Sequence, residues 1–142
     1  MSQVTYGDGT VEDPWLLQTP AQSSTYSAWR DETADPAALV VQVGRTRLSY
    51  RLRALDDLHA MLAEHGGWMT LGNADEGKPV KDGTVEAWAR DPSNPVGGYY
   101  GLRPGYRGRF ANYVTPVLEL LGRAELEHQP RNNRVRALPV PA

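Results

Sequence analysis

Residues 107–121, with the sequence RGRFANYVTPVLELL, carry the clearest secondary-structure signal in the chain. Large apolar side chains recur there at intervals of three and four residues, at Phe110, Tyr113, Val114, Val117, Leu118 and Leu121. This spacing predicts one apolar face on a helix that begins near Arg107. Pro116 interrupts the helix because proline lacks a backbone N–H. We favour a kink at Pro116, since the apolar face is unbroken; the alternative is a new turn capped by Thr115.

The segments on both sides of this helix extend the prediction. In chain order they are a helix at 54–65, a short strand at 68–71, a helix at 85–90 and, after the 107–121 helix, a hairpin with strands at 124–128 and 134–138. Thr84 is a suitable N-cap for the second helix, and Gly66 ends the first. This order resembles the winged-helix fold over residues 54–138. The resemblance is one of layout, and it implies a third helix whose N-terminal end meets the edges of DNA bases.

The residues before position 54 predict a different architecture. Residues 1–24 contain one apolar anchor, at Trp15, and are expected to form an irregular docking arm. Residues 25–53 alternate between apolar and polar side chains, which predicts two or three antiparallel strands. The fold class is therefore α+β, in one domain over residues 1–142. Its parts are the arm (1–24), the small antiparallel sheet (25–53), the winged-helix-like part (54–138) and a tail (139–142).

Composition limits the classes of function. The chain has 142 residues, 40% of them hydrophobic, and a formal net charge of −2. Cysteine is absent, which excludes disulfides, cysteine-based metal sites and thiol catalysis. No run reaches the roughly 18 uncharged apolar residues that a membrane span needs. No stretch has the features of a signal peptide, so we expect a cytoplasmic protein that does not bind membranes.

Charge is distributed unevenly along the chain. Residues 1–102 have a formal charge of −6, whereas residues 103–142 have a formal charge of +4. Such a dipolar distribution can attract an anionic partner to the basic end. The leading hypothesis is therefore a non-enzymatic binding module for nucleic acid or for an acidic protein. Its predicted contacts are Arg107, Arg109 and Asn112 at the helix start, with Arg131, Asn132, Asn133 and Arg134 in the hairpin turn. Alternatively, these residues form a solvated helix end and an ordinary turn.

Two polar and aromatic loops, at residues 72–83 and 91–105, suggest a small-molecule-binding protein or an enzyme as the alternative function. Their predicted pocket is lined by Trp68, Asp75, Glu76, Trp88, Tyr99, Tyr100 and Arg103. Asp75 or Glu76 would then act as a base. The simpler interpretation is a surface loop whose tyrosines pack against Trp88 or Trp68. The sequence contains no phosphate-binding motif and no nucleophile elbow, so catalysis has little support.

The remaining candidates have simpler structural explanations. His59, His65 and His128 lack the spacing of metal ligands, so we expect no metal and no cofactor. A basic strand face at Arg47, Arg51 and Arg53 is expected to pair with the neighbouring carboxylates Asp56, Asp57 and Glu64. A structural subunit that forms a homodimer through the apolar arm around Trp15 is a third alternative.

Three segments resemble those of a conserved bacterial protein family without an established activity. They are GDGTVEDPW (7–15), NPVGGYYGLR (94–103) and EHQPRNNR (127–134). The resemblance extends over nearly the whole chain and implies an origin in high-GC bacteria, which fits the 13 arginines against 2 lysines. It implies no catalytic residue.

Overall fold

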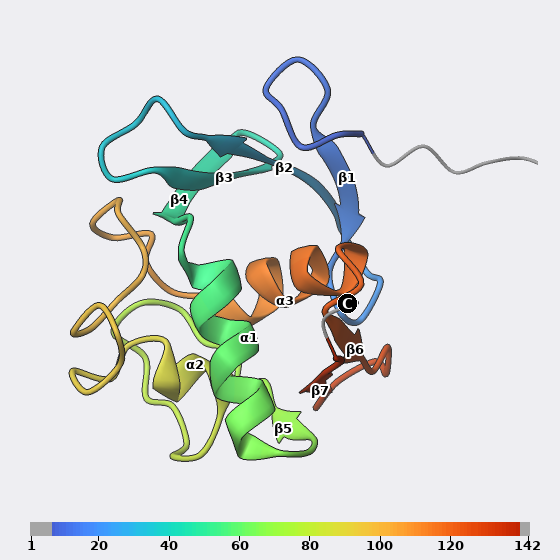
Figure 1. Cartoon of the computed structure of the whole chain (residues 1–142), viewed down its shortest axis with the longest axis vertical. Helices are drawn as coiled ribbons and strands as arrows, with labels where there is room; N and C mark the ends of the chain where they lie inside the picture. Colours follow the sequence, from blue (N-terminus) through green and yellow to red (C-terminus); the bar gives the residue numbers. More distant parts are fainter. Residues whose placement is uncertain (1–6, 140–142) are drawn as a thin grey trace, which may run out of the picture.

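The computed structural model describes residues 7–139, so predictions for residues 1–6 and 140–142 lie outside the described residues. Two antiparallel sheets lie on either side of helix α3 (Phe110–Leu120), with helix α1 (Ala54–His65) beside it (Figure 1). This arrangement is a mixed α and β fold, as the sequence predicts at that level.

The first sheet, sheet A, is a four-stranded meander in the order β1-β2-β3-β4. Its strands are β1 (Trp15–Gln18), β2 (Thr25–Asp31), β3 (Ala38–Val43) and β4 (Thr46–Arg51). Trp15, Ala28, Val41 and Leu48 are successive partners across the sheet, and all four are buried. The predicted alternation is therefore confirmed, and one face of the sheet belongs to the core.

The prediction of an irregular arm is wrong for Trp15–Gln18, which form strand β1 at the edge of sheet A. Trp15 is only 4% exposed, and the guanidinium of Arg30 lies 5.1 Å from the centre of its ring. A Cβ atom at Gly9 would lie 2.3 Å from the same ring, so only glycine fits there. Trp15 itself is enclosed and offers no surface to a second chain, while the homodimer stays a prediction.

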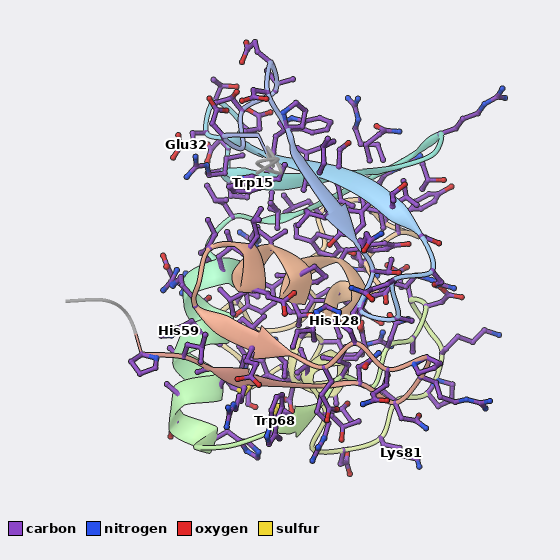
Figure 2. All side chains as sticks on the ribbon, turned by 90° about the vertical axis from the view of Figure 1, so that its right-hand side faces the viewer. Trp15, Glu32, His59, Trp68, Lys81 and His128 are labelled. Carbon is purple, nitrogen blue, oxygen red and sulfur yellow. The ribbon has the colours of Figure 1, made fainter. Side chains whose placement is uncertain are left out.

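From residue 54 onward, the chain follows the predicted order of elements. After α1 come β5 (Met69–Thr70), α2 (Val85–Trp88), α3, β6 (Ala124–Leu126) and β7 (Arg134–Ala137). The strands form the second sheet, sheet B, in the order β5-β7-β6. The Thr84 hydroxyl accepts a hydrogen bond from the Ala87 N–H, as expected of an N-cap, and Gly66 ends α1 in the left-handed conformation. Trp15 in sheet A and Trp68 near sheet B lie in opposite halves of the molecule (Figure 2).

Two boundaries differ from the prediction. Helix α2 ends at Trp88, whose carbonyl accepts the Asn94 side chain at 2.8 Å and the Asp91 N–H at 3.2 Å, because Pro92 has no N–H with which to continue the helix. Helix α3 begins at Phe110 instead of Arg107, because Arg109 is left-handed with φ 57°. It continues through Pro116 as one helix, so the alternative of a new turn capped by Thr115 is not observed.

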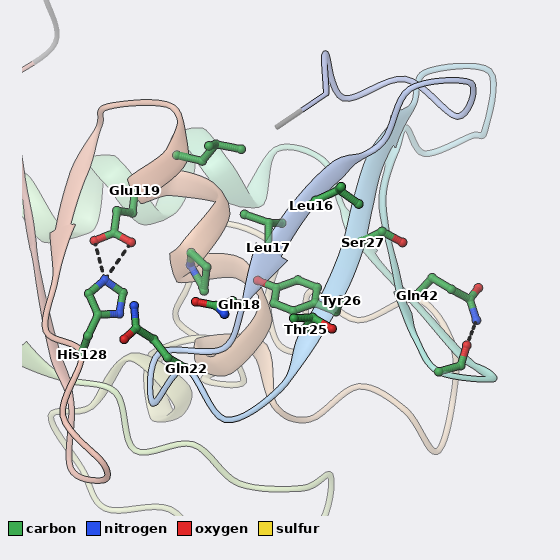
Figure 3. Close-up of a pocket in the computed structure, with 13 residues that line it drawn as sticks. Leu16, Leu17, Gln18, Gln22, Thr25, Tyr26, Ser27, Gln42, Glu119 and His128 are labelled. Atoms are coloured by element: carbon green, nitrogen blue, oxygen red, sulfur yellow. Dashed lines mark hydrogen bonds and ion pairs between the residues drawn. The ribbon is translucent and has the colours of Figure 1, made fainter. Parts of the chain in front are cut away.

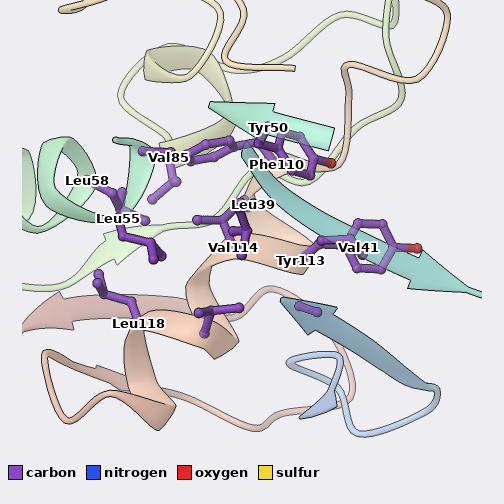
Figure 4. Close-up of a cluster of buried hydrophobic side chains, with 14 of the residues drawn as sticks. Leu39, Val41, Tyr50, Leu55, Leu58, Val85, Phe110, Tyr113, Val114 and Leu118 are labelled. Atoms are coloured by element: carbon purple, nitrogen blue, oxygen red, sulfur yellow. The ribbon is translucent and has the colours of Figure 1, made fainter. Parts of the chain in front are cut away.

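Sheet A covers the face of α3 that a winged-helix protein would leave exposed. The Tyr26 hydroxyl donates to the Tyr113 carbonyl at 2.8 Å, and the rings of Tyr50 and Phe110 pack edge to face at 5.7 Å. Val114 and Leu118 are fully buried in the same core (Figure 4). The order of elements thus agrees with the expected layout, but α3 is enclosed from both sides, and a winged-helix fold is not established.

Candidate functional site

The loops predicted to form a ligand pocket are joined instead by a buried carboxylate. Glu86, on α2, is 1% exposed and accepts hydrogen bonds from the backbone N–H groups of Phe110 (3.3 Å) and Ala111 (2.9 Å). It also forms an ion pair with Arg90 at 3.0 Å. Because α3 has no side-chain cap of its own, Glu86 satisfies the donors at its first turn.

Arg90 extends this connection to the 72–83 loop. Its guanidinium donates to the carbonyls of Lys78 (3.0 Å) and Ala74 (3.2 Å). Burial raises the pKa of the Glu86 carboxyl above its usual range, and this outweighs the opposite effects of the Ala111 N–H and Arg90. The loop, α2 and α3 therefore form one hydrogen-bonded unit.

The two carboxylates proposed as catalytic bases are already engaged. Glu76 accepts from the N–H of Gly105 at 2.9 Å, and from the N–H and the side chain of Arg107 at 3.0 and 2.5 Å. Asp75 is paired with Arg109. Hydrogen bonds from these arginines lower the pKa of both carboxyls. A base for catalysis near neutral pH needs the opposite shift.

The aromatic residues of the predicted pocket do not converge on one cavity. Trp88 stacks on Tyr100 at 5.2 Å, as the simpler interpretation expects, and Tyr99 lies between the guanidiniums of Arg90 and Arg107. Trp68 packs elsewhere, against the arginines of β7. A depression of about 530 Å³ beside α1 includes only Trp88 of the seven predicted residues.

The predicted basic contacts are mostly neutralised within the chain. Arg107 and Arg109 are paired as described, and Arg134 is paired with Glu127 at 2.7 Å. In the hairpin turn, the Asn133 side chain is buried and bonded to Gln129 through both of its polar atoms. The backbone of Asn132 has the left-handed conformation. The Asn112 side chain is half-buried, whereas Arg131 is exposed. No hydrogen bond between described residues joins the helix-start residues to the turn.

The other charged candidates have structural partners. Arg53 pairs with Asp57 at 2.8 Å as predicted, but Asp56 pairs with Arg123 instead. Each histidine ring is bonded to a backbone carbonyl: His59 to Leu138, His65 to Trp68 and His128 to Pro20. Within residues 7–139, no group of three or more suitable side chains could hold a metal ion.

A groove of about 1070 Å³ lies along β1, where the sequence predicts no site (Figure 3). We call it the β1 groove. Strands β1 and β2 form one wall, and the C-terminal half of α3 with His128 forms the other. Its lining residues are Leu16, Leu17, Gln18, Gln22, Thr25, Tyr26, Ser27, Gln42, Gly44, Pro116, Glu119, Leu120 and His128.

The outer edge of β1 is open to this groove. The Thr19 N–H donates to the Ser24 carbonyl, so in an antiparallel pair Thr19, Leu17 and Trp15 direct their main-chain groups toward β2. Leu16 and Gln18 therefore direct theirs outward, and no backbone hydrogen bond from residues 7–139 reaches them. The opposite edge, on β4, is covered by residues 100–102.

Lysine and arginine are absent from the lining residues of the β1 groove. Its only acidic lining group, Glu119, is bonded to the His128 ring at 3.0 Å, and the other ring nitrogen lies 3.0 Å from the Pro20 carbonyl. The remaining polar groups are uncharged amides and hydroxyls. Leu16 is 61% exposed, which leaves an apolar side chain in solvent beside the open edge.

Comparison with known proteins places the chain in a family. A family model matches residues 7–138. The chain belongs to DUF6855, a family of unknown function. The predicted resemblance to an uncharacterised family is thereby confirmed, whereas the high-GC bacterial origin stays a prediction. No curated protein and no solved structure matches this DUF6855 chain. Among its described residues, no helix has the length and apolar character needed to cross a membrane.

Removing the buried carboxylate should destabilise this DUF6855 protein strongly. We expect Glu86→Ala to lower the free energy of unfolding by about 3–5 kcal/mol, because Arg90 and the first N–H groups of α3 would lose their acceptor. Urea unfolding monitored by tryptophan fluorescence measures the change. Glu64→Ala, at an exposed position on α1, is the control and should change stability by less than about 0.5 kcal/mol. Equal effects of the two substitutions would contradict the assigned role.

Glu86 should also make stability depend on pH. Because its pKa is raised in the folded state, that state binds more protons than the unfolded state above about pH 4.3. The stabilising contribution of protonated Glu86 is therefore full at low pH and is lost as pH rises through the raised pKa. Wild type should lose stability relative to Glu86→Gln as pH rises from about 4.3 through the raised pKa of Glu86. Unfolding curves for both proteins over this range test it; a constant difference would disprove it.

Proposed function

We propose that this protein is a non-enzymatic binding module that holds its partner in the β1 groove. The observation that carries the proposal is the open edge of β1, whose outward main-chain groups at Leu16 and Gln18 line a cavity of about 1070 Å³. Ligand sites are typically concave, with apolar surface and a few polar groups that fix orientation, and the β1 groove has these features. A cytoplasmic location remains part of the proposal.

The absence of a free catalytic group among the described residues of the groove supports binding over catalysis. General acid–base catalysis requires a side chain that can reach the proton it transfers. Both nitrogens of His128 already face acceptors, and Glu119 is one of these. The other lining side chains are amides, hydroxyls, a phenol and apolar groups, and the Tyr26 hydroxyl is bonded to Tyr113.

A charged substitution inside the groove should abolish binding without unfolding the protein. A display library of random ten-residue peptides and a panel of uncharged small molecules would be screened on wild-type protein. For the ligands obtained, we expect Leu16→Lys to raise Kd at least tenfold, because it places a charge at the open edge. Val11→Lys is the matched control, since Val11 is 59% exposed and does not line the groove. Equal affinity of Leu16→Lys and wild type would rule out the β1 groove.

A second version of the binding module, with nucleic acid or an acidic protein as partner, rests on the exposed Arg131 at the hairpin turn. Arg134 beside it is 48% exposed despite its pairing with Glu127. Because the arginines at the start of α3 are paired and α3 is enclosed by sheet A, the turn is the better-placed part of this predicted site.

The nucleic-acid version predicts a salt-dependent affinity. Fluorescence anisotropy with short duplex DNA should show binding at low salt, and Arg131→Ala with Arg134→Ala should reduce the slope of log K against log salt by about 2. Arg45→Ala, an exposed arginine on the β3–β4 turn, is the control. Absence of binding at low salt would eliminate DNA as the partner and leave the β1 groove proposal unaffected.

A further inference from the structure

We infer that the occupant of the β1 groove is an uncharged, extended peptide segment that adds to sheet A as a fifth strand beside β1. This inference rests on the proposed function and specifies its partner. It follows from three properties of the groove: the direction of the main-chain groups on β1, the chemistry of the opposite wall and the lack of uncompensated charge.

The main chain of β1 provides the recognition element. Leu16 and Gln18 each present one N–H and one C=O away from β2, which gives four groups that can bond to a neighbouring strand. They are two residues apart, so they match the spacing of bonded residues in an extended peptide. Strand addition to an open sheet edge is an established way in which domains capture peptides, and main-chain bonds supply much of its affinity.

The walls define the side chains that a peptide should carry. Pro116 and Leu120 on α3 line the groove together with Leu17 from the inner face of sheet A, so peptide side chains on that side should be apolar. On the other side, Leu16 lines the groove from the outer face of sheet A, so peptide side chains there should be small and apolar or polar.

Charge decides between classes of peptide. No lysine or arginine lines the groove, and the carboxylate of Glu119 already has the His128 ring as its partner. An acidic or basic peptide side chain would lose water there without gaining an opposite charge, which is costly. An uncharged segment avoids that loss and can bond to the amides of Gln18 and Gln22.

The test separates main-chain recognition from side-chain recognition at one position. Gln18→Pro removes the outward N–H, while the neighbouring Thr19 keeps its bond to Ser24 and the residue before proline already has the extended conformation. Gln18→Ala removes the side chain alone. With capped, uncharged ten-residue peptides selected from the library on wild-type protein, Gln18→Pro should raise Kd at least tenfold and Gln18→Ala less than threefold.

Three further measurements use the wild-type protein and do not depend on the folding of a variant. N-methylation of the peptide, one residue at a time, should weaken binding at every second position only. Hydrogen exchange of the Leu16 and Gln18 amides should slow at least tenfold in the complex, with little change at Leu17, which is already bonded to β2. Introducing one lysine at the centre of the peptide should raise Kd at least tenfold.

The outcomes that overturn the inference differ from those that overturn the proposed function. If N-methylation has the same effect at all positions, or if Gln18→Pro binds like wild type, strand addition is wrong even where Leu16→Lys still prevents binding. Failure to select any uncharged peptide overturns the inference as well. If sedimentation shows a concentration-dependent dimer that Gln18→Pro dissociates, the occupant is a second copy of this chain instead of a peptide.

Discussion

The burial of one carboxylate, Glu86, holds the 72–83 loop, α2 and the start of α3 together. Its oxygens accept the N–H groups at the start of α3, where that helix lacks a cap, and its charge is balanced by Arg90. Arg90 in turn holds the carbonyls of the 72–83 loop. A buried charge is tolerated only where it is paired and hydrogen-bonded, so loop, α2 and α3 must keep this geometry together.

The fixed start of α3 determines how the rest of the chain packs. Helix α3 is enclosed by sheet A on one face and by sheet B on another. Eight of its eleven residues are buried, and six of these belong to a continuous hydrophobic core. The arginines that precede it are occupied by Asp75 and Glu76. Consequently the net positive charge of residues 103–142 does not become a basic surface at the helix start. Sequence charge counts do not reveal this, since they cannot tell which carboxylate lies beside which arginine.

Much of the fold could be predicted because it follows from local patterns. The 54–65 helix, the strands of residues 25–53, the Thr84 cap and the terminal hairpin depend on spacing within a few residues, and all are observed. Helix α3 begins three residues later than its apolar pattern suggests, because the residue that caps it, Glu86, is 24 positions away from Phe110. Strand β1 was missed because four residues around a lone tryptophan show almost no period. The β1 groove combines three distant segments, so no local pattern could predict it.

The two edges of sheet A are treated differently, and this difference points to function. Residues 100–102 pair with β4, where the Arg51 N–H donates to the Tyr100 carbonyl and the Ser49 carbonyl accepts from the Leu102 N–H; proteins usually protect an edge in this way. Strand β1 has no such cover from the described residues, and none of its four residues is charged. Charged residues at an edge prevent unwanted pairing, so their absence beside an exposed Leu16 favours a specific partner over a protected surface. The shortness of β1 and the wall formed by α3 and His128 limit that partner to a narrow segment. The shape of the groove, instead of charged side chains, thus limits which segments can pair with the open edge of β1.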